Sequence, residues 1–183
     1  MFKIGILLSG RGSNFLSIYN NLDPNGKIVV VISDKKDAEG LQKARELGIE
    51  TVHIKHKHEK NIIEALKKHN VDLVVLAGYM KIISSTFCAS FPEKIINIHP
   101  SLLPSFPGLH AQKQAFEYGV KYSGVTVHYV DEGMDTGKII AQIVVPRYEK
   151  DTLEEFEARI LEQEHKLYPR VVNWFINDKQ KVI

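Results

Sequence analysis

The run IGILLSG at Ile4–Gly10 decides the fold class of this chain of 183 residues. Its apolar part continues from Ile4 to Leu8 without a polar interruption, which is typical of a strand buried in a parallel sheet. Ser9 and Gly10 close the strand, and Phe15, Ile18, Tyr19 and Leu22 then follow at helical spacing. The start of the chain therefore predicts a strand followed by a helix, the repeating unit of an α/β fold.

The same alternation continues through the first half of the chain. Buried strands are expected at 28–32, 51–54 and 71–77. One helix between them ends at Gly48, a favoured residue just after a helix, and another, over 62–66, ends near Asn70. This order predicts a parallel sheet with helices on both faces, joined by right-handed crossovers.

The second half of the chain has a different order of strands and helices. A strand at 95–99 leads into a proline-rich loop, and a helix over 111–118 follows. Strands near 124–130 and 139–145 are joined by a connection short enough for an antiparallel pair. Thr152 and Glu155 form a capping box that opens the last helix, which Pro169 is expected to interrupt. The expected fold is a Rossmann-like three-layer α/β sandwich, with a mostly parallel twisted sheet and antiparallel strands in its C-terminal half.

Composition narrows the classes of protein to consider. With 44% hydrophobic and 25% charged residues, the chain suits one domain over 1–183. A formal charge of +2 gives no sign of a nucleic-acid surface. Cys88 is the only cysteine, which excludes an internal disulfide and a cysteine zinc site. The N-terminus passes directly into a strand, so we expect no signal peptide, no membrane span and a cytoplasmic location.

The run INIHPSLLP at Ile96–Pro104 carries the strongest indication of chemistry. Asn97 and His99 stand two residues apart in a strand and therefore project from the same face of the sheet. Pro100 ends regular pairing and stiffens the loop beyond. A hydrogen-bond donor and a titratable ring thus lie at the carboxyl end of a strand, where open parallel sheets place their active sites. The alternative is a histidine that is satisfied locally in a turn.

The glycine-rich loop Ser9–Asn14 joins the first strand to the first helix. Unpaired amides at a helix N-terminus bind anions, and Ser13 or Asn14 could cap the helix or donate to a phosphate. A dinucleotide fingerprint needs a third glycine where this chain has Phe15, although Asp34 stands where a ribose-binding acid would. We therefore favour a single phosphomonoester, with a dinucleotide site and an ordinary turn as alternatives.

Three further groups of polar residues have open roles. Asp131, Glu132 and Asp135 form an acidic loop; Asp135 could turn inward to orient His99, or the loop could be a solvated turn. His56–His58 alternates histidines in a metal-like pattern, but its lysine neighbours favour a solvated basic loop. His128 could face a cleft or simply pack.

Together these motifs resemble the folate-dependent formyltransferase family, across almost the whole chain. The matching segments are GRGSN at Gly10–Asn14, LAGYM at Leu76–Met80, NIHPSLLP at Asn97–Pro104, Asp131–Gly137 and IIAQ at Ile139–Gln142. The loop Gly12–Asn14 and Gln163–His165 are similar to the members that act on a glycinamide ribonucleotide.

The resemblance implies transfer of a formyl group from 10-formyltetrahydrofolate to the amine of that ribonucleotide. It implies a catalytic trio of Asn97, His99 and Asp135. The N-terminal half, about 1–95, would hold the ribose phosphate, and the half from about 96 to 183 would hold the folate and the catalytic groups. The residues implied for ribonucleotide binding are Gly12, Ser13, Asn14 and Glu164. Those implied for folate binding are Met80, Lys81, Ile82, Ile83, Asn97, Asp131, Glu132, Gly133, Met134 and Asp135.

The implied partners are these two small molecules, with no metal, nucleic acid or membrane, and the chain is expected to be a monomer or a homodimer. Two features depart from the family pattern. Lys81 stands where the family commonly has Arg, and a lysine cannot reproduce a bidentate fork. The segment 53–60 is shorter than usual and lacks an Arg that often contacts the phosphate. A formyltetrahydrofolate hydrolase, a methionyl-tRNA formyltransferase and a non-catalytic nucleotide-binding module remain as alternatives.

Overall fold

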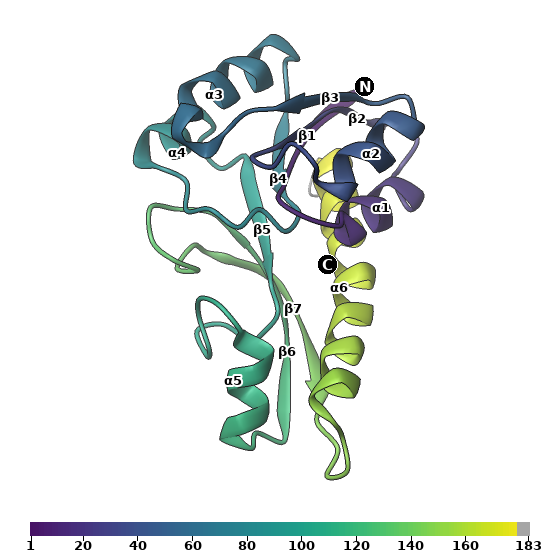
Figure 1. Cartoon of the computed structure of the whole chain (residues 1–183), viewed down its shortest axis with the longest axis vertical. Helices are drawn as coiled ribbons and strands as arrows, with labels where there is room; N and C mark the ends of the chain where they lie inside the picture. The colour runs from purple at the N-terminus through teal and green to yellow at the C-terminus, as the bar shows by residue number, and fades with distance from the viewer. Residues whose placement is uncertain (179–183) are drawn as a thin grey trace.

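The computed structural model describes residues 1–178 and centres on one seven-stranded sheet in the order β3-β2-β1-β4-β5-β6-β7 (Figure 1). The last five residues of the predicted domain lie outside this range. The strands are β1 (Phe2–Leu8), β2 (Gly26–Ser33), β3 (Glu50–His53), β4 (Leu73–Leu76), β5 (Ile95–His99), β6 (Tyr122–Tyr129) and β7 (Ile139–Pro146). β1 to β5 pair in parallel, whereas β6 runs antiparallel to both β5 and β7. The predicted fold class and the predicted antiparallel strands of the second half are confirmed.

Helices cover the two faces of the sheet. They are α1 (Ser13–Asn20), α2 (Glu39–Glu46), α3 (Glu59–Lys68), α4 (Ser85–Ser90), α5 (Ala111–Tyr118) and α6 (Leu153–Ile176), and a 3-10 turn, η1 (His56–His58), precedes α3. Hydrophobic periodicity does not predict α4, because six residues hold fewer than two turns. Its start is fixed locally, since the Ser84 hydroxyl accepts a hydrogen bond from the Phe87 N–H.

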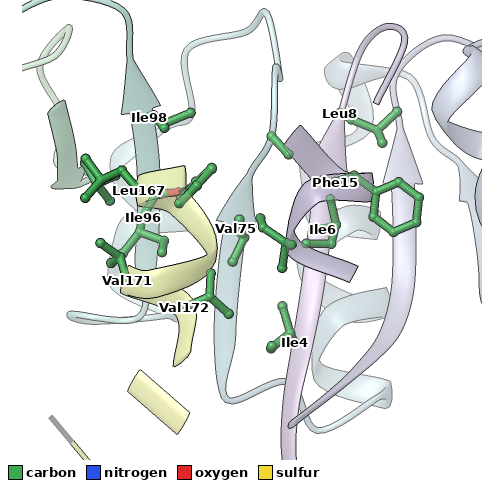
Figure 2. Packing of buried hydrophobic residues seen from close by; sticks show 14 of the residues in the cluster. Ile4, Ile6, Leu8, Phe15, Val75, Ile96, Ile98, Leu167, Val171 and Val172 are labelled. Atoms are coloured by element: carbon green, nitrogen blue, oxygen red, sulfur yellow. Dashed lines mark hydrogen bonds between the residues drawn. The ribbon is translucent and has the colours of Figure 1, made fainter. Parts of the chain in front are cut away.

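Two hydrophobic clusters form, one on each face. The larger joins α1, α2, α5 and α6 to the sheet, and Figure 2 shows Leu167, Val171 and Val172 of α6 near Val75 and Ile96. The smaller joins α3 and α4 to the opposite face of β1, β2, β4 and the start of β5. Because α3 and α4 stop at β5, no helix among residues 1–178 packs over β6 and β7 on that face. A cleft lies beside this uncovered part of the sheet.

The helix α6 corrects one prediction. Pro169 was expected to interrupt it, but the helix is continuous from Leu153 to Ile176 and follows the long axis of the molecule beside β6 and β7 (Figure 1). A proline removes the N–H that would bond the carbonyl four residues earlier, here that of His165. The Ser17 hydroxyl of α1 donates to this carbonyl at 2.6 Å. Tertiary packing therefore supplies the missing donor. The predicted capping box of Thr152 and Glu155 is confirmed.

Candidate active site

A cleft of about 560 Å³ runs over the carboxyl ends of β4 and β5 and is lined by most of the predicted site residues. It lies beside the pair β1 and β4, where the chain changes direction across the sheet, the position at which open α/β sheets bind ligands. The predicted residues that line it are Asn14, Met80, Lys81, Ile82, Ile83, Asn97, His99, Asp131, Gly133, Met134, Asp135 and Glu164. Gly12, Ser13 and Glu132 do not line this cleft.

The structure brings His99 and Asp135 together. His99 Nδ1 lies 3.4 Å from Asp135 Oδ2, and both side chains are largely buried. His99 Nε2 lies 2.8 Å from the Phe106 carbonyl oxygen, which can only accept a hydrogen bond, so Nε2 carries the proton of the neutral ring. Nδ1 is therefore the nitrogen that gains a proton when the ring becomes charged, and Asp135 is the counter-ion that faces it.

Asn97 presents an uncommitted side-chain amide to the same cleft. It is half-buried on β5, two residues before His99, and lines the cleft with it. Within residues 1–178 no hydrogen bond engages its side chain. The predicted shared face is confirmed, because Ile96 and Ile98 pack into the larger core on the other side of the sheet. Its amide N–H is thus available to a ligand.

Hydrogen bonds within the acidic loop turn Asp135 inward. The Asp131 carboxylate accepts from the Gly133 N–H and the Thr136 hydroxyl, which folds the loop on itself. Asp135 adopts a left-handed φ of 55°, and its Oδ2 accepts from the Gly108 N–H at 2.7 Å. A side chain at Gly137 would meet the Tyr129 carbonyl oxygen at 1.7 Å, so only glycine allows this close return of the chain. The loop is a built structure and not a simple solvated turn.

His128 is the functional candidate that sequence reasoning left undecided. It is buried and also lines the cleft, with Nε2 3.8 Å from Asp135 Oδ1. Its Nδ1 lies 2.7 Å from the Tyr129 carbonyl oxygen and must donate to it, which leaves a bare Nε2. Burial lowers the pKa of His128 despite the hydrogen bond to Tyr129 and the charge of Asp135. The pairing of β5 with β6 indicates that His128 faces the cleft, since it lies opposite Asn97 on the neighbouring strand.

Hydrogen bonds from residues of β6 and β7 hold the proline-rich loop after β5 in place. The Thr126 hydroxyl donates to the Ser101 carbonyl and accepts from the Leu103 N–H. The Gln142 amide donates to both the Leu103 carbonyl and the Thr126 hydroxyl at 3.0 Å. Neither threonine nor glutamine was predicted to act here. These contacts place Phe106 and Gly108, the backbone partners of His99 and Asp135 respectively.

The glycine-rich loop ends in an open helix N-terminus. Gly12 is the N-cap residue of α1, with a φ of 74°, and a Cβ there would lie 2.8 Å from Gly40 Cα. No side chain caps this helix, so neither Ser13 nor Asn14 fills the capping role considered for them. The free amides of the first turn therefore remain available to an anion, as predicted for a phosphate.

Ser9 and Asn14 connect this loop to other parts of the chain. The Ser9 hydroxyl donates to Asp34 Oδ1 and accepts from the Met80 N–H, so Ser9 links the segments that follow β1, β2 and β4. Asn14 Nδ2 donates to Glu164 Oε2 of α6 at 2.8 Å. Burial raises the pKa of Glu164 to about 7, and the hydrogen bond from Asn14 opposes that rise.

The opposite wall of the cleft is apolar and partly open to solvent. Met80, Ile82 and Met134 are each more than half exposed at its rim, whereas Ile83 is buried. Tyr79, which also lines the cleft, has its hydroxyl 3.0 Å from His56 Nδ1. His56 is therefore half-buried and partnered, while Lys57 and His58 are exposed as expected. Exposed apolar side chains beside buried polar ones suit a flat ring system with a polar edge.

Two further searches covered the described part of the chain. Across residues 1–178, no group of three or more His, Cys, Asp or Glu side chains is arranged to hold a metal ion. In the same range, no helix combines the length and apolar character needed to cross a bilayer.

Comparison with known proteins gives consistent matches. Residues 2–172 match the formyl transferase family. The chain is 46% identical to the phosphoribosylglycinamide formyltransferase of Bacillus subtilis, over 94% of this chain and 93% of that protein. A crystal structure of the phosphoribosylglycinamide formyltransferase of Anaplasma phagocytophilum superposes with a TM-score of 0.95 at 45% identity, covering 98% of this chain and 89% of that one. The glycinamide ribonucleotide transformylase 1 of Symbiobacterium toebii gives 0.92 at 44% identity, covering 97% and 89%.

Proposed function

This chain belongs to the formyl transferase family, and we propose that it transfers a formyl group from 10-formyltetrahydrofolate to the amine of 5-phosphoribosylglycinamide, a step of de novo purine biosynthesis. The observation that carries the proposal is the meeting of Asn97, His99 and Asp135 in one cleft, with His99 and Asp135 3.4 Å apart. A binding module without catalysis would not need a buried histidine and carboxylate side by side next to an uncommitted amide.

The chemistry requires stabilisation of a tetrahedral intermediate. The amine nitrogen attacks the formyl carbon, a C–N bond forms, and the carbonyl oxygen becomes an oxyanion. Asn97 donates a hydrogen bond to this oxygen, and such a donor is typically worth ~10²–10³ in rate. Protonated His99 stabilises the oxyanion through its positive charge, because its two ring nitrogens face the Phe106 carbonyl and Asp135. The bond to the folate nitrogen then breaks, and the proton lost by the amine passes to that nitrogen. Asp135 stabilises the imidazolium and assists the proton transfer.

The cleft and the N-terminus of α1 beside it suit the two substrates. The open N-terminus of α1, with Gly12, Ser13 and Asn14, holds the ribose phosphate. Glu164 lies beside Asn14 and faces the glycinamide end. The apolar rim of Met80, Ile82, Ile83 and Met134, with Lys81 and the Asp131–Asp135 loop, holds the folate. Bringing the substrates together in one cleft supplies a large part of the acceleration.

Other expectations follow from this role. The partners are the two small molecules, and neither nucleic acid nor a membrane is required. We place the protein in the cytoplasm, as a monomer or a homodimer. Because Lys81 offers a point charge in place of a bidentate fork, its contact to the folate is a single charge-assisted hydrogen bond. The phosphate contact that an arginine commonly makes in relatives has no assigned residue here.

A direct assay tests the function. Purified protein is mixed with 5-phosphoribosylglycinamide and 10-formyltetrahydrofolate, and the deformylated folate is followed by absorbance. Release that depends on the ribonucleotide, with formylated ribonucleotide as product, is the expected result. Release at the same rate without the ribonucleotide would identify a hydrolase instead.

The variant His99→Ala tests the catalytic assignment in the same assay. It should fold normally and lose at least ~10²-fold in kcat; near-native turnover would contradict the catalytic assignment.

A further inference from the structure

Asn14 and Glu164 form a buried contact between two distant parts of the chain. The Asn14 side-chain amide of α1 donates to Glu164 Oε2 of α6 at 2.8 Å. Asn14 is 9% exposed and Glu164 7% exposed, and both line the cleft. Glu164 Oε1 has no hydrogen-bond partner among residues 1–178. One oxygen of the acid is therefore held by Asn14, and the other is left for a ligand.

This contact changes the role expected for Asn14. One of the two N–H donors of its side-chain amide is directed to a carboxylate, and a negative charge on that carboxylate disfavours a phosphate at the same amide. The phosphate can still bind the backbone amides of the first turn of α1, which no side chain caps. Binding of the phosphate and orientation of Glu164 thus use different atoms of the same short segment.

We propose that Asn14 is a positioning residue that acts through Glu164, fixing the buried carboxylate so that Oε1 faces the bound ribonucleotide while the phosphate is held by the neighbouring backbone. The inference rests on the proposed function and assigns the side chain of Asn14 to Glu164 and not to the phosphate. A rigid hydrogen bond on one oxygen holds the acid in a single orientation, which lowers the cost of ordering it when substrate binds.

The surroundings of Glu164 support a role for this hydrogen bond in holding the charge. Burial favours the neutral acid, and Asn14 favours the carboxylate. On its own helix, Tyr168 lies near enough for Glu164 to raise its pKa, and burial lowers the pKa of the adjacent His165. The other titratable groups that line the cleft are His99, His110, His128, Asp131, Asp135, Tyr79 and Lys81. Within residues 1–178, Asn14 is the polar side chain that donates a hydrogen bond to Glu164 and favours the ionised acid.

A kinetic experiment separates this role from a phosphate contact. Asn14→Ala, Ser13→Asp and the control Asn20→Ala, an exposed amide on the same helix, are compared with 5-phosphoribosylglycinamide and with the riboside that lacks the phosphate. Asn14→Ala should lower kcat/KM about tenfold with both substrates. Ser13→Asp should lower it only for the phosphorylated substrate. In a Glu164→Gln background, Asn14→Ala should add less than a twofold loss. A defect of Asn14→Ala that vanishes with the riboside would overturn the proposal.

A second experiment needs no turnover. Carboxyl ¹³C NMR follows the titration of Glu164 in the ligand-free protein, with Glu164→Gln assigning the signal. Asn14→Ala should move the midpoint upward by about one pH unit, because a hydrogen bond to the charged form is lost. Asn14→Asp, which has the same size, should move it upward too, and Asn20→Ala should leave it unchanged. A midpoint unmoved in both Asn14 variants would overturn the proposal. If the unmodified protein transfers no formyl group, the proposed function fails while this titration still decides the role of Asn14.

Discussion

The proposed ribonucleotide end and the proposed catalytic end of the site are built in opposite ways. At the proposed ribonucleotide end, the consecutive residues Ser9–Asn14 form an uncapped helix N-terminus through their own backbone. At the proposed catalytic end, Asn97, His99 and Asp135 come from a strand and from a distant loop that returns to it. The first end can be recognised from a short motif, whereas the second depends on how separate segments converge. The comparison also predicts which substitutions impair chemistry and which impair binding.

The largest expected effect lies at the convergent end. Asp135→Asn keeps an oxygen that can accept from Gly108 but removes the charge that faces His99. We expect kcat to fall by ~10²–10³ with little change in the KM of the ribonucleotide. Steady-state kinetics measure this, with thermal unfolding as a check on folding and Glu117→Gln on the exposed face of α5 as a matched control. A kcat within threefold of the unmodified enzyme would remove Asp135 from the mechanism.

The next effect tests whether the ribonucleotide end also depends on a distant partner. The folded-state pKa of Glu164 is raised from 4.5 to about 7, so the stability associated with its neutral form is complete below about pH 4.5 and is lost as the pH rises through 7. The shift corresponds to roughly 3 kcal/mol. Glu164→Gln cannot ionise and should show a flatter dependence of unfolding free energy on pH. Denaturant titrations between pH 4.5 and 8 measure this, and parallel curves for the two proteins would refute it.

A smaller effect tests the local motif directly. Ser13→Asp places a negative charge in the first turn of α1, where the phosphate is expected. Repulsion should weaken ribonucleotide binding by about tenfold or more and leave folate binding intact. Calorimetric titration with each ligand measures both affinities. Equal weakening of the two ligands would mean that the loop is not specific to the ribonucleotide.

The smallest effect concerns the packing of α1 against α6. Ser17→Ala removes the donor to the His165 carbonyl, which Pro169 leaves without its helical partner. We expect the unfolding free energy to fall by ~1 kcal/mol without a change in kcat. Urea denaturation measures it. Ser90→Ala, which removes an exposed hydroxyl bonded within α4, is the matched control and should change stability by less than ~0.5 kcal/mol. Equal stability losses in both variants would contradict the special role of Ser17.

Much of the fold could be predicted because its signals are local. The apolar runs that became β1, β2 and β4 match buried parallel strands, and the pair Thr152 and Glu155 marks the start of α6. The predicted interruption of the last helix at Pro169 is wrong because the effect of this proline is not local. Its effect on a helix depends on whether another element supplies a donor, and Ser17 belongs to a helix at the other end of the chain.

The candidate site likewise contains positions that follow from local sequence and positions that depend on tertiary packing. The shared face of Asn97 and His99 follows from the two-residue period of a strand. The position of Asp135 does not, since it depends on Asp131, Gly108 and Gly137 acting together in three dimensions. The role of His128 could not be predicted for the same reason. Its side chain is buried and also lines the cleft, and the sequence does not show which part of the sheet the helices leave uncovered.

The sequence by itself determined the α/β fold, the glycine-rich loop before the first helix and the family resemblance, because each is encoded by residues close together in the chain. Only the tertiary structure decided that Asp135 faces His99, that His128 stands behind Asp135, and that the side chain of Asn14 engages Glu164. These contacts join residues from separate elements. Their distances are set by the packing of whole strands, loops and helices, which no local pattern of residues records.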